Sequence, residues 1–261
     1  MITSTSNAKI RNLLQIKRKN KERDAQDAFL VEGVKMFGEI PPERIREVYV
    51  SESFQKSGQL RSELAGLKKN LYEVTDTVFQ KMSDTQTPQG VMALVSQLHY
   101  READLIRGNA PLVMILENLQ DPGNLGTIIR TAEGAGVTGI LITKGSADLY
   151  NPKVTRSTMG SIFRVPFCYT ENLAESVNAM KRQGIKVFGA HLQGSSPYGK
   201  ENYCGGSAFL IGNESRGLSP SAVSLADVLI RIPLLGKVES LNAAIASAVL
   251  MYEARRQREE E

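Results

Sequence analysis

Short apolar runs alternate with helical patterns along the first hundred residues. Branched and aromatic side chains gather in four runs that predict β-strands, at residues 28–31, 48–50, 71–74 and 91–95. Helical spacing of apolar residues separates these runs, at residues 33–40, 60–67 and 75–82. An amphipathic helix, which we expect Ser6 to cap, precedes them with Ile10 and Leu13 on its apolar face. The pattern predicts a small α/β layer over residues 1–96.

The alternation restarts with more strongly apolar strands further along the chain. Six short runs are bounded by turn residues, at residues 112–116, 139–143, 165–169, 187–190, 208–211 and 228–232. Helical patterns separate most of them, as expected for a largely parallel sheet that is covered by helices on both faces. The polar and charged stretch 97–110 is the expected linker, so we predict an α/β protein whose second domain spans residues 111–261.

Composition excludes several classes of protein. No apolar run approaches the roughly 20 residues that a membrane span needs. The first residues lack the basic and then apolar layout of a secretory signal, so we expect a cytoplasmic protein. The two cysteines, Cys168 and Cys204, are too few and too far apart for a disulfide framework or a zinc site, and we expect no metal.

Positive charge is concentrated at the N-terminus, although the formal net charge is only +4. Residues 1–23 hold seven lysines and arginines and a single acid, Glu22. Such an arm suits a polyanion, because lysine and arginine neutralise phosphates. A solvated helix face that keeps the protein soluble is the alternative explanation. The candidate polyanion contacts on the first helix are Arg11, Lys17, Arg18 and Lys19.

Three polar loops follow predicted strands and lead into helices. In the first, residues 118–132, we expect Asn124 to cap a helix, while Arg130 lies off its apolar stripe with a guanidinium suited to phosphate or carboxylate. In the second, residues 209–220, Gly212 would let a ligand approach the backbone, and Ser219 and Pro220 start a helix.

The third loop, residues 232–242, precedes the last helix. Ser240 is the expected cap, and Asn242 either completes the cap or faces a ligand. Capping alone explains any one such loop, but three at carboxyl ends of strands favour a ligand site in an α/β sheet. No phosphate-binding loop of known pattern is present. With only His99 and His191, a Ser-His-Asp hydrolase is disfavoured. The residues alone therefore predict an α/β ligand-binding protein.

Taken together, the three loops resemble the motifs of the SpoU (TrmH-like) RNA ribose methyltransferases of the SPOUT superfamily. The matching phrases are DPGNLG with RTA at 121–132, GNESRGL at 212–218, and IPL with SLN at 232–242. The phrases FLVEG at 29–33 and PQGV at 88–91 are similar to the ribosomal-protein-like RNA-binding domain often fused to these enzymes. The resemblance implies a knotted, largely parallel sheet, a homodimer, and methylation of a ribose 2′-hydroxyl by S-adenosylmethionine.

The resemblance also implies roles for individual residues. The residues expected to meet the cofactor are Gly212, Ile232 and Leu241, mostly through their backbone, with Ala190, Leu234 and Asn213 beside them. Arg130 is the expected central catalytic residue, and Asn124, Glu214, Ser240 and Asn242 would orient it and the ribose. Because arginine stays protonated, we predict that Arg130 holds a phosphate and stabilises the alkoxide, rather than acting as a base.

Ribosomal RNA is the predicted substrate because of the fused N-terminal domain, and transfer RNA is the second choice. A role in antibiotic resistance would also fit the resemblance. Two rival functions remain. One is an RNA-binding protein of this fold without catalysis, against which the intact Arg130, Glu214 and Asn242 argue. The other is an enzyme of a different class that binds a nucleotide for small-molecule chemistry, against which the basic N-terminal domain argues.

Overall fold

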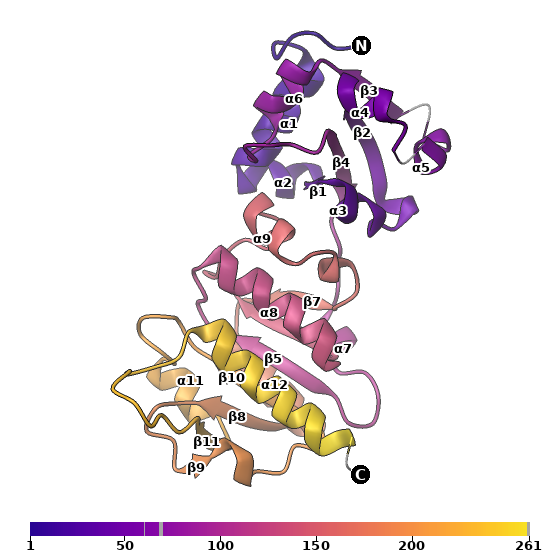
Figure 1. Cartoon of the computed structure of the whole chain (residues 1–261). Helices are drawn as coiled ribbons and strands as arrows, with labels where there is room; N and C mark the ends of the chain where they lie inside the picture. Colours follow the sequence, from indigo (N-terminus) through magenta and orange to yellow (C-terminus); the bar gives the residue numbers. More distant parts are fainter. Residues whose placement is uncertain (60, 68–69, 260–261) are drawn as a thin grey trace. The chain divides into compact units, whose positions relative to one another are not determined.

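The chain divides into two compact units, and each unit is formed by two segments that are separated in the sequence. The computed structural model describes residues 1–59, 61–67 and 70–259 (Figure 1). Unit 1 consists of residues 1–98 and 148–163, and unit 2 of residues 99–147 and 164–261. Among the described residues, no helix is both long and apolar enough to cross a membrane.

Unit 1 is built on a four-stranded sheet with the order β1-β4-β2-β3. Strands β2 and β3 pair in parallel, whereas β4 runs antiparallel to both β1 and β2. The strands are β1 (Ala28–Glu32), β2 (Ile45–Ser51), β3 (Leu71–Val74) and β4 (Val91–Ser96). The helices are α1 (Ala8–Arg18), α2 (Asn20–Gln26), α3 (Val34–Gly38), α4 (Glu52–Ser57), α5 (Arg61–Ala65), α6 (Asp76–Met82) and α9 (Pro152–Ser157), with 3₁₀ turns η1 (Pro42–Arg44) and η3 (Ser161–Phe163). The four predicted strands are present; residue 60 of the predicted helix 60–67 lies outside the described residues.

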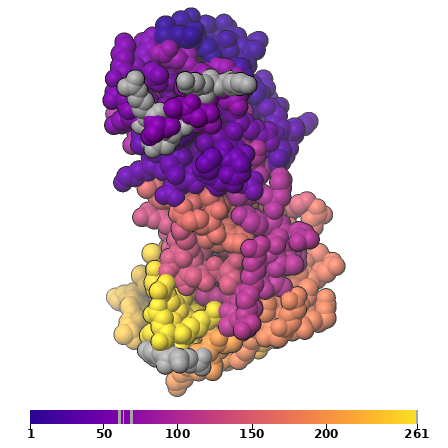
Figure 2. All heavy atoms as spheres, turned by 90° about the vertical axis from the view of Figure 1, so that its right-hand side faces the viewer, coloured from indigo at the N-terminus to yellow at the C-terminus, as the bar shows by residue number. Residues whose placement is uncertain are grey.

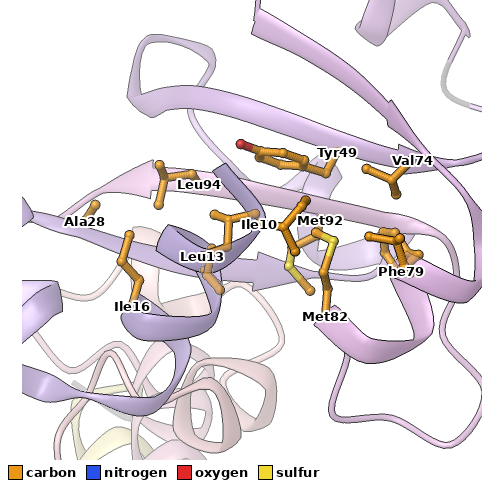
Figure 3. Packing of buried hydrophobic residues seen from close by; sticks show 12 residues of the cluster. Ile10, Leu13, Ile16, Ala28, Tyr49, Val74, Phe79, Met82, Met92 and Leu94 are labelled. Atoms are coloured by element: carbon orange, nitrogen blue, oxygen red, sulfur yellow. The ribbon is translucent and has the colours of Figure 1, made fainter. Parts of the chain in front are cut away.

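The core of unit 1 lies between helices α1 and α6 and one face of the sheet (Figure 3). Ile10, Leu13 and Ile16 occupy successive turns of α1 and are fully buried, as their spacing predicts. They meet Tyr49 of β2 and Met82 of α6 in the same cluster. The first helix begins one residue later than predicted, because Asn7 rather than Ser6 caps it by accepting from the N–H of Lys9.

Residues 148–163 pack into unit 1 although they lie far along the chain. The side chain of Arg23 is only 4% exposed, and its Nε donates to Oδ2 of Asp148 over 2.9 Å. The hydroxyl of Tyr150 bonds both the N–H and the carbonyl of Leu98 at 2.8 Å, and its ring lies 4.7 Å from that of Phe29. These long-range contacts extend unit 1 beyond the expected range 1–96.

Unit 2 contains a seven-stranded, fully parallel sheet with the order β7-β6-β5-β10-β8-β11-β9. Its strands are β5 (Leu112–Leu116), β6 (Gly139–Thr143), β7 (Phe167–Thr170), β8 (Lys186–Ala190), β9 (Ser196–Pro197), β10 (Ser207–Ile211) and β11 (Val228–Arg231). The helices are α7 (Glu102–Leu105), α8 (Pro122–Ala135), α10 (Leu173–Arg182), α11 (Pro220–Leu225) and α12 (Ala243–Glu259), with the 3₁₀ turn η4 (Tyr198–Lys200). The predicted parallel α/β sheet is confirmed.

Helices cover both faces of this sheet, which explains why its central strands are apolar throughout. On one face, side chains of α7, α10 and α11 form a buried cluster with alternate residues of β5, β6, β8 and β10. On the other face, α8 and α12 pack side by side, with α12 also against β10 (Figure 1). Figure 2 shows α12, in yellow, at the surface of unit 2.

The expected linker 97–110 contains α7, and its residues from His99 onward belong to unit 2. Leu105 is fully buried, and a Cβ atom built at Gly139 of β6 would lie 2.5 Å from its Cα. Only glycine therefore allows α7 to lie this close to the strand. The polar residues of the stretch lie on the exposed side of a short helix, so its composition resembles that of a linker.

Two helix caps differ from prediction in the same way. Asp121 caps α8, since its Oδ1 accepts from the N–H of Asn124 over 2.7 Å. Asn242 caps α12, accepting from the N–H groups of Ala244 and Ile245 at 2.9 and 3.3 Å. Asn124 and Ser240 were the predicted caps. Both loops contain several residues able to cap, and backbone conformation decides between them. Ser219 caps α11 as predicted.

Candidate active site at the carboxyl ends of the unit 2 strands

A pocket of about 490 Å³ opens where β8, β10 and β11 end, entirely within unit 2. Strands that run parallel end at the same edge, so loops distant in sequence meet there. The lining comes from four stretches and from α12, namely residues 190–193, 211–218, 230–234 in part, 239–241, and Ala243, Ala246 and Leu250. All six residues predicted to bind a cofactor line this pocket: Ala190, Gly212, Asn213, Ile232, Leu234 and Leu241.

The pocket has an apolar interior and a polar rim. Ile211, Leu218 and Ile230 are buried side chains of its wall, and Leu250 of α12 adds to them. The polar lining residues lie mainly on exposed loop positions. Such a combination suits a ligand with a flat apolar ring system and a polar or charged tail.

The loop after β10 closes on itself through Asn213. Its backbone N–H and carbonyl exchange hydrogen bonds with Gly217 at 3.0 and 2.9 Å. Its side-chain oxygen accepts from the N–H groups of Ser215 and Arg216 at 3.0 and 3.1 Å, and its amide donates to the carbonyl of Asn118 over 2.8 Å. The side chain of Asn213 therefore shapes the pocket wall by holding its backbone.

The loop requires a glycine at position 212 for a steric reason that the sequence did not reveal. A Cβ atom at this position would lie 2.2 Å from the carbonyl carbon of Gly217 and 2.3 Å from the nitrogen of Leu218. The missing side chain thus makes room for the returning strand of the loop. Whether a ligand also approaches the backbone of Gly212 stays a prediction.

Glu214 links the loop after β10 to the start of α8. One carboxylate oxygen accepts from the N–H of Gln120 over 3.0 Å, and the other from the N–H of Asp121 over 2.9 Å. The amide of Asn124 donates to the latter oxygen over 3.1 Å. Burial by itself would raise the pKa of Glu214, but these donors outweigh it, so its pKa lies below the ordinary value of 4.5.

Three predicted catalytic residues form one hydrogen-bonded chain across three loops. Asn242, at the start of α12, donates from Nδ2 to the side-chain oxygen of Asn124 over 2.9 Å. Asn124 in turn donates to Glu214. Each residue is fixed by a second role: Asn242 caps α12, and Glu214 binds two backbone N–H groups. The arrangement holds the three loops at defined distances from one another.

The model of the SpoU rRNA Methylase family matches residues 111–252, which is more than half of the chain. This chain belongs to the SpoU rRNA methylase family. A second model, the MRM3-like substrate binding domain, matches residues 7–93. The predicted family membership is confirmed.

One curated relative and two solved structures match this SpoU-family chain over nearly its whole length. The 23S rRNA (guanosine(2553)-2′-O)-methyltransferase RlmP of Bacillus subtilis is 33% identical over 97% of this chain and 98% of its own. The AdoMet-bound rRNA methyltransferase of Sinorhizobium meliloti is 29% identical with a TM-score of 0.87, covering 98% and 97% of the two chains. The AviRb methyltransferase of Streptomyces viridochromogenes, in complex with AdoMet, is 25% identical with a TM-score of 0.88 over 97% and 98%.

The remaining predicted site residues of the SpoU-family chain lie in two kinds of place. Ser240 is exposed and lines the pocket. Arg130 is exposed on α8, on the side away from the buried Ile128 and Ile129, and is not a pocket-lining residue. The single chain therefore assembles the cofactor candidates and the Asn242–Asn124–Glu214 chain, but it does not bring Arg130 into the pocket.

The predicted RNA contacts on α1 also divide. Lys17 is only 11% exposed; its ammonium donates to the carbonyl of Met82 over 2.8 Å and pairs with Asp84 over 2.8 Å. That amine therefore ties α1 to the end of α6. Arg11, Arg18 and Lys19 are exposed, and within the described ranges no ion pair involves their side chains. The spacing of apolar residues in the helix did not distinguish these two situations.

Sequence reasoning missed several residues of the site. The capping role of Asp121 was missed because Asn124 is an equally suitable residue type for a helix cap. Proline at the first helical position, which here follows Asp121, is a common helix start. Glu117, directly after β5, is 6% exposed and accepts from both the N–H and the hydroxyl of Ser219, at 2.9 and 2.5 Å. It positions the start of α11 beside the pocket, and no sequence pattern marks this partner.

Replacing Glu214 tests whether its carboxylate fixes the loops. We expect Glu214→Gln to lower the free energy of unfolding by about 1–2 kcal/mol at neutral pH, because an amide nitrogen then faces backbone donors. The depressed pKa of the wild-type carboxyl makes its contribution full above about pH 4.5, and protonation removes it as the pH falls through the lowered pKa. Urea unfolding of both proteins between about pH 7 and pH 3 should show the difference shrinking. A difference independent of pH would contradict this role.

Proposed function

We propose that this protein transfers a methyl group from S-adenosylmethionine to a ribose 2′-hydroxyl of RNA, with ribosomal RNA as its substrate. The main support is the 490 Å³ pocket flanked by the Asn242–Asn124–Glu214 chain, at the edge where the family motifs meet. The relative RlmP, named for 2′-O-methylation of 23S rRNA, aligns with both units. Structures named for tRNA modification cover only 61% and 59% of this chain, which favours ribosomal RNA.

The residues of the pocket fit the proposed cofactor. Its apolar wall suits an adenine ring, with Leu234 and Leu241 at partly buried positions. The backbone of Gly212, Ile232 and Leu241 would supply polar contacts, while Ala190 and Asn213 complete the wall. When bound, S-adenosylmethionine supplies a methyl group activated by its sulfonium centre.

The polar residues would then act on the RNA. We assign to Arg130 the binding of a neighbouring phosphate and the stabilisation of negative charge on the 2′-oxygen. Its guanidinium stays protonated, so the proton of the hydroxyl passes to a phosphate oxygen or to water. Asn124 and Asn242, held by their mutual hydrogen bond, would orient the ribose together with Ser240.

We also propose that the C-terminal sheet has the knotted threading that is typical of SPOUT proteins.

Replacing Arg130 tests the catalytic assignment. We expect Arg130→Ala to reduce the rate of methyl transfer to ribosomal RNA by about 100-fold, the scale for losing a positioned charge stabiliser. Affinity for S-adenosylmethionine should remain, because Arg130 does not line the pocket. Arg182→Ala, an exposed arginine on α10, serves as the matched control. The transfer of radiolabelled methyl groups to ribosomal RNA and to transfer RNA is measured for both variants. Near-normal activity of Arg130→Ala would refute the role.

The exposed cations on α1 and at its end provide the second test. We expect the triple change Arg11→Gln, Arg18→Gln and Lys19→Gln to flatten the dependence of RNA affinity on salt, by about 0.7–0.9 in the logarithmic slope for each phosphate that is no longer neutralised. Lys17 stays unchanged, because its ammonium is engaged inside unit 1. The same change at Lys35, Lys56 and Lys81, exposed elsewhere on unit 1, is the control. An unaltered slope in the first variant would favour a role in solubility alone.

We propose that the protein is a homodimer whose contact includes α12. Ile245 and Tyr252 are 53% and 51% exposed, and lie two turns apart on one side of the helix. Exposed apolar side chains of this size favour burial against another surface. A partner at this face would also lie beside α8, which carries Arg130 on its exposed side.

Light scattering tests the dimer. We expect the wild type to show about twice the chain mass of 28.6 kDa, and Ile245→Glu to shift it towards a single chain because a carboxylate would be buried in the contact. Lys200→Glu, at another exposed position of unit 2, should leave the mass unchanged. A wild type with the mass of one chain would exclude this proposal.

A further inference from the structure

The rim of the pocket carries two charges that the fold itself does not use. Among the described lining residues, the basic residue is Arg216 and the acidic residues are Glu214 and Glu239, histidine not being counted. Glu214 is already bound by three donors from residues 120–124. The side chains of Arg216 and Glu239 are exposed, and within the part of the chain that the structure describes neither has an ion pair.

The backbone beneath Arg216 is held firmly while its side chain is free. Its N–H donates to the side-chain oxygen of Asn213 over 3.1 Å, inside the loop that the Asn213–Gly217 hydrogen bonds close. An arginine on a fixed backbone loses less freedom when it binds a ligand than one on an open loop. The guanidinium, with its planar set of donors, matches a carboxylate in a bidentate geometry.

Glu239 approaches the pocket from a different loop. It precedes Ser240 and Leu241, which also line the cavity, in the stretch between β11 and α12. One cation and one anion thus stand on separate loops at the rim of one pocket, whose interior is apolar. Opposite charges in this arrangement match a zwitterion attached to an apolar ring system.

We infer that Arg216 and Glu239 bind the amino-acid end of the cofactor, Arg216 its α-carboxylate and Glu239 its α-ammonium group. The inference rests on the proposed function, since it takes S-adenosylmethionine as the ligand of this pocket. The apolar wall accepts the adenine, and the two rim charges accept the methionyl group. Both residues bind and orient the cofactor, and neither acts on the reacting atoms.

Ligands that lack part or all of the amino-acid end test the assignment. Decarboxylated S-adenosylmethionine lacks only the carboxylate. 5′-Methylthioadenosine lacks the whole amino-acid end, and its sulfur is a neutral thioether. Calorimetric titration measures the dissociation constant of each for the wild type, Arg216→Gln, Glu239→Gln and the control Lys237→Gln. Lys237 is an exposed cation on the same loop as Glu239 and does not line the pocket.

The pairing predicts which combinations lose affinity. Arg216→Gln should weaken binding of S-adenosylmethionine about tenfold, the scale of a hydrogen bond to a charged group, and leave the decarboxylated compound unaffected. Glu239→Gln should weaken both compounds that carry the ammonium group and leave 5′-methylthioadenosine unaffected. Arg216→Lys should retain part of the affinity, because it keeps the charge without the bidentate geometry. Lys237→Gln should match the wild type with all three ligands.

Failure of this inference is distinguishable from failure of the proposed function. If the wild type binds none of the three ligands, the pocket does not take this cofactor and the proposed function loses its support. If the wild type binds S-adenosylmethionine and Arg216→Gln binds it equally well, only the inference is overturned. A loss of RNA affinity with a flatter salt dependence in Arg216→Gln, at unchanged cofactor affinity, would assign Arg216 to an RNA phosphate instead.

Discussion

The geometry of the site depends on the hydrogen bonds that the carboxylate of Glu214 accepts. This carboxylate joins the loop after β10 to the start of α8, binding two backbone N–H groups and the side chain of Asn124. Through Asn124 it also reaches Asn242, which caps α12. Three loops that each leave a different strand or enter a different helix therefore share one network. Because its members also complete loop and helix ends, the site and the local fold stabilise each other.

This network explains how an otherwise irregular edge of the sheet holds a defined pocket. The loop 213–217 is closed by its own backbone, and Gly212 provides the space into which that loop returns. Glu117 fixes the start of α11 from the next strand. With these polar groups satisfied internally, Arg216 and Glu239 are the charged side chains of the described lining that remain available to a ligand.

Local patterns in the sequence predict the strands, but they do not predict which distant segments pack into the same unit. All strands of both sheets except β9 were predictable, because their apolar runs are local and bounded by turn residues; β5 and β6 have the predicted limits. The two residues of β9, Ser196 and Pro197, form no apolar run. The membership of residues 148–163 in unit 1 was not predictable. It depends on Arg23 meeting Asp148 and on Tyr150 meeting Leu98, pairs that no local pattern marks. The same limit applies to α7, because no local pattern in the expected linker 97–110 indicates that Leu105 packs against Gly139.

The sequence by itself determined the class of fold and the family, and it singled out six of the residues that line the pocket where β8, β10 and β11 end. These features could be predicted because strand periodicity and the three motifs depend on residues that are neighbours in the sequence. Tertiary structure alone decided which polar residues serve the fold and which remain available. Lys17 and Arg18 are adjacent in the chain, yet only Lys17 pairs inside unit 1. Glu214 and Arg216 lie two residues apart, yet three donors bind only Glu214. Residue type fixes what a side chain can bind, and the partners that the fold brings to it decide what it does bind.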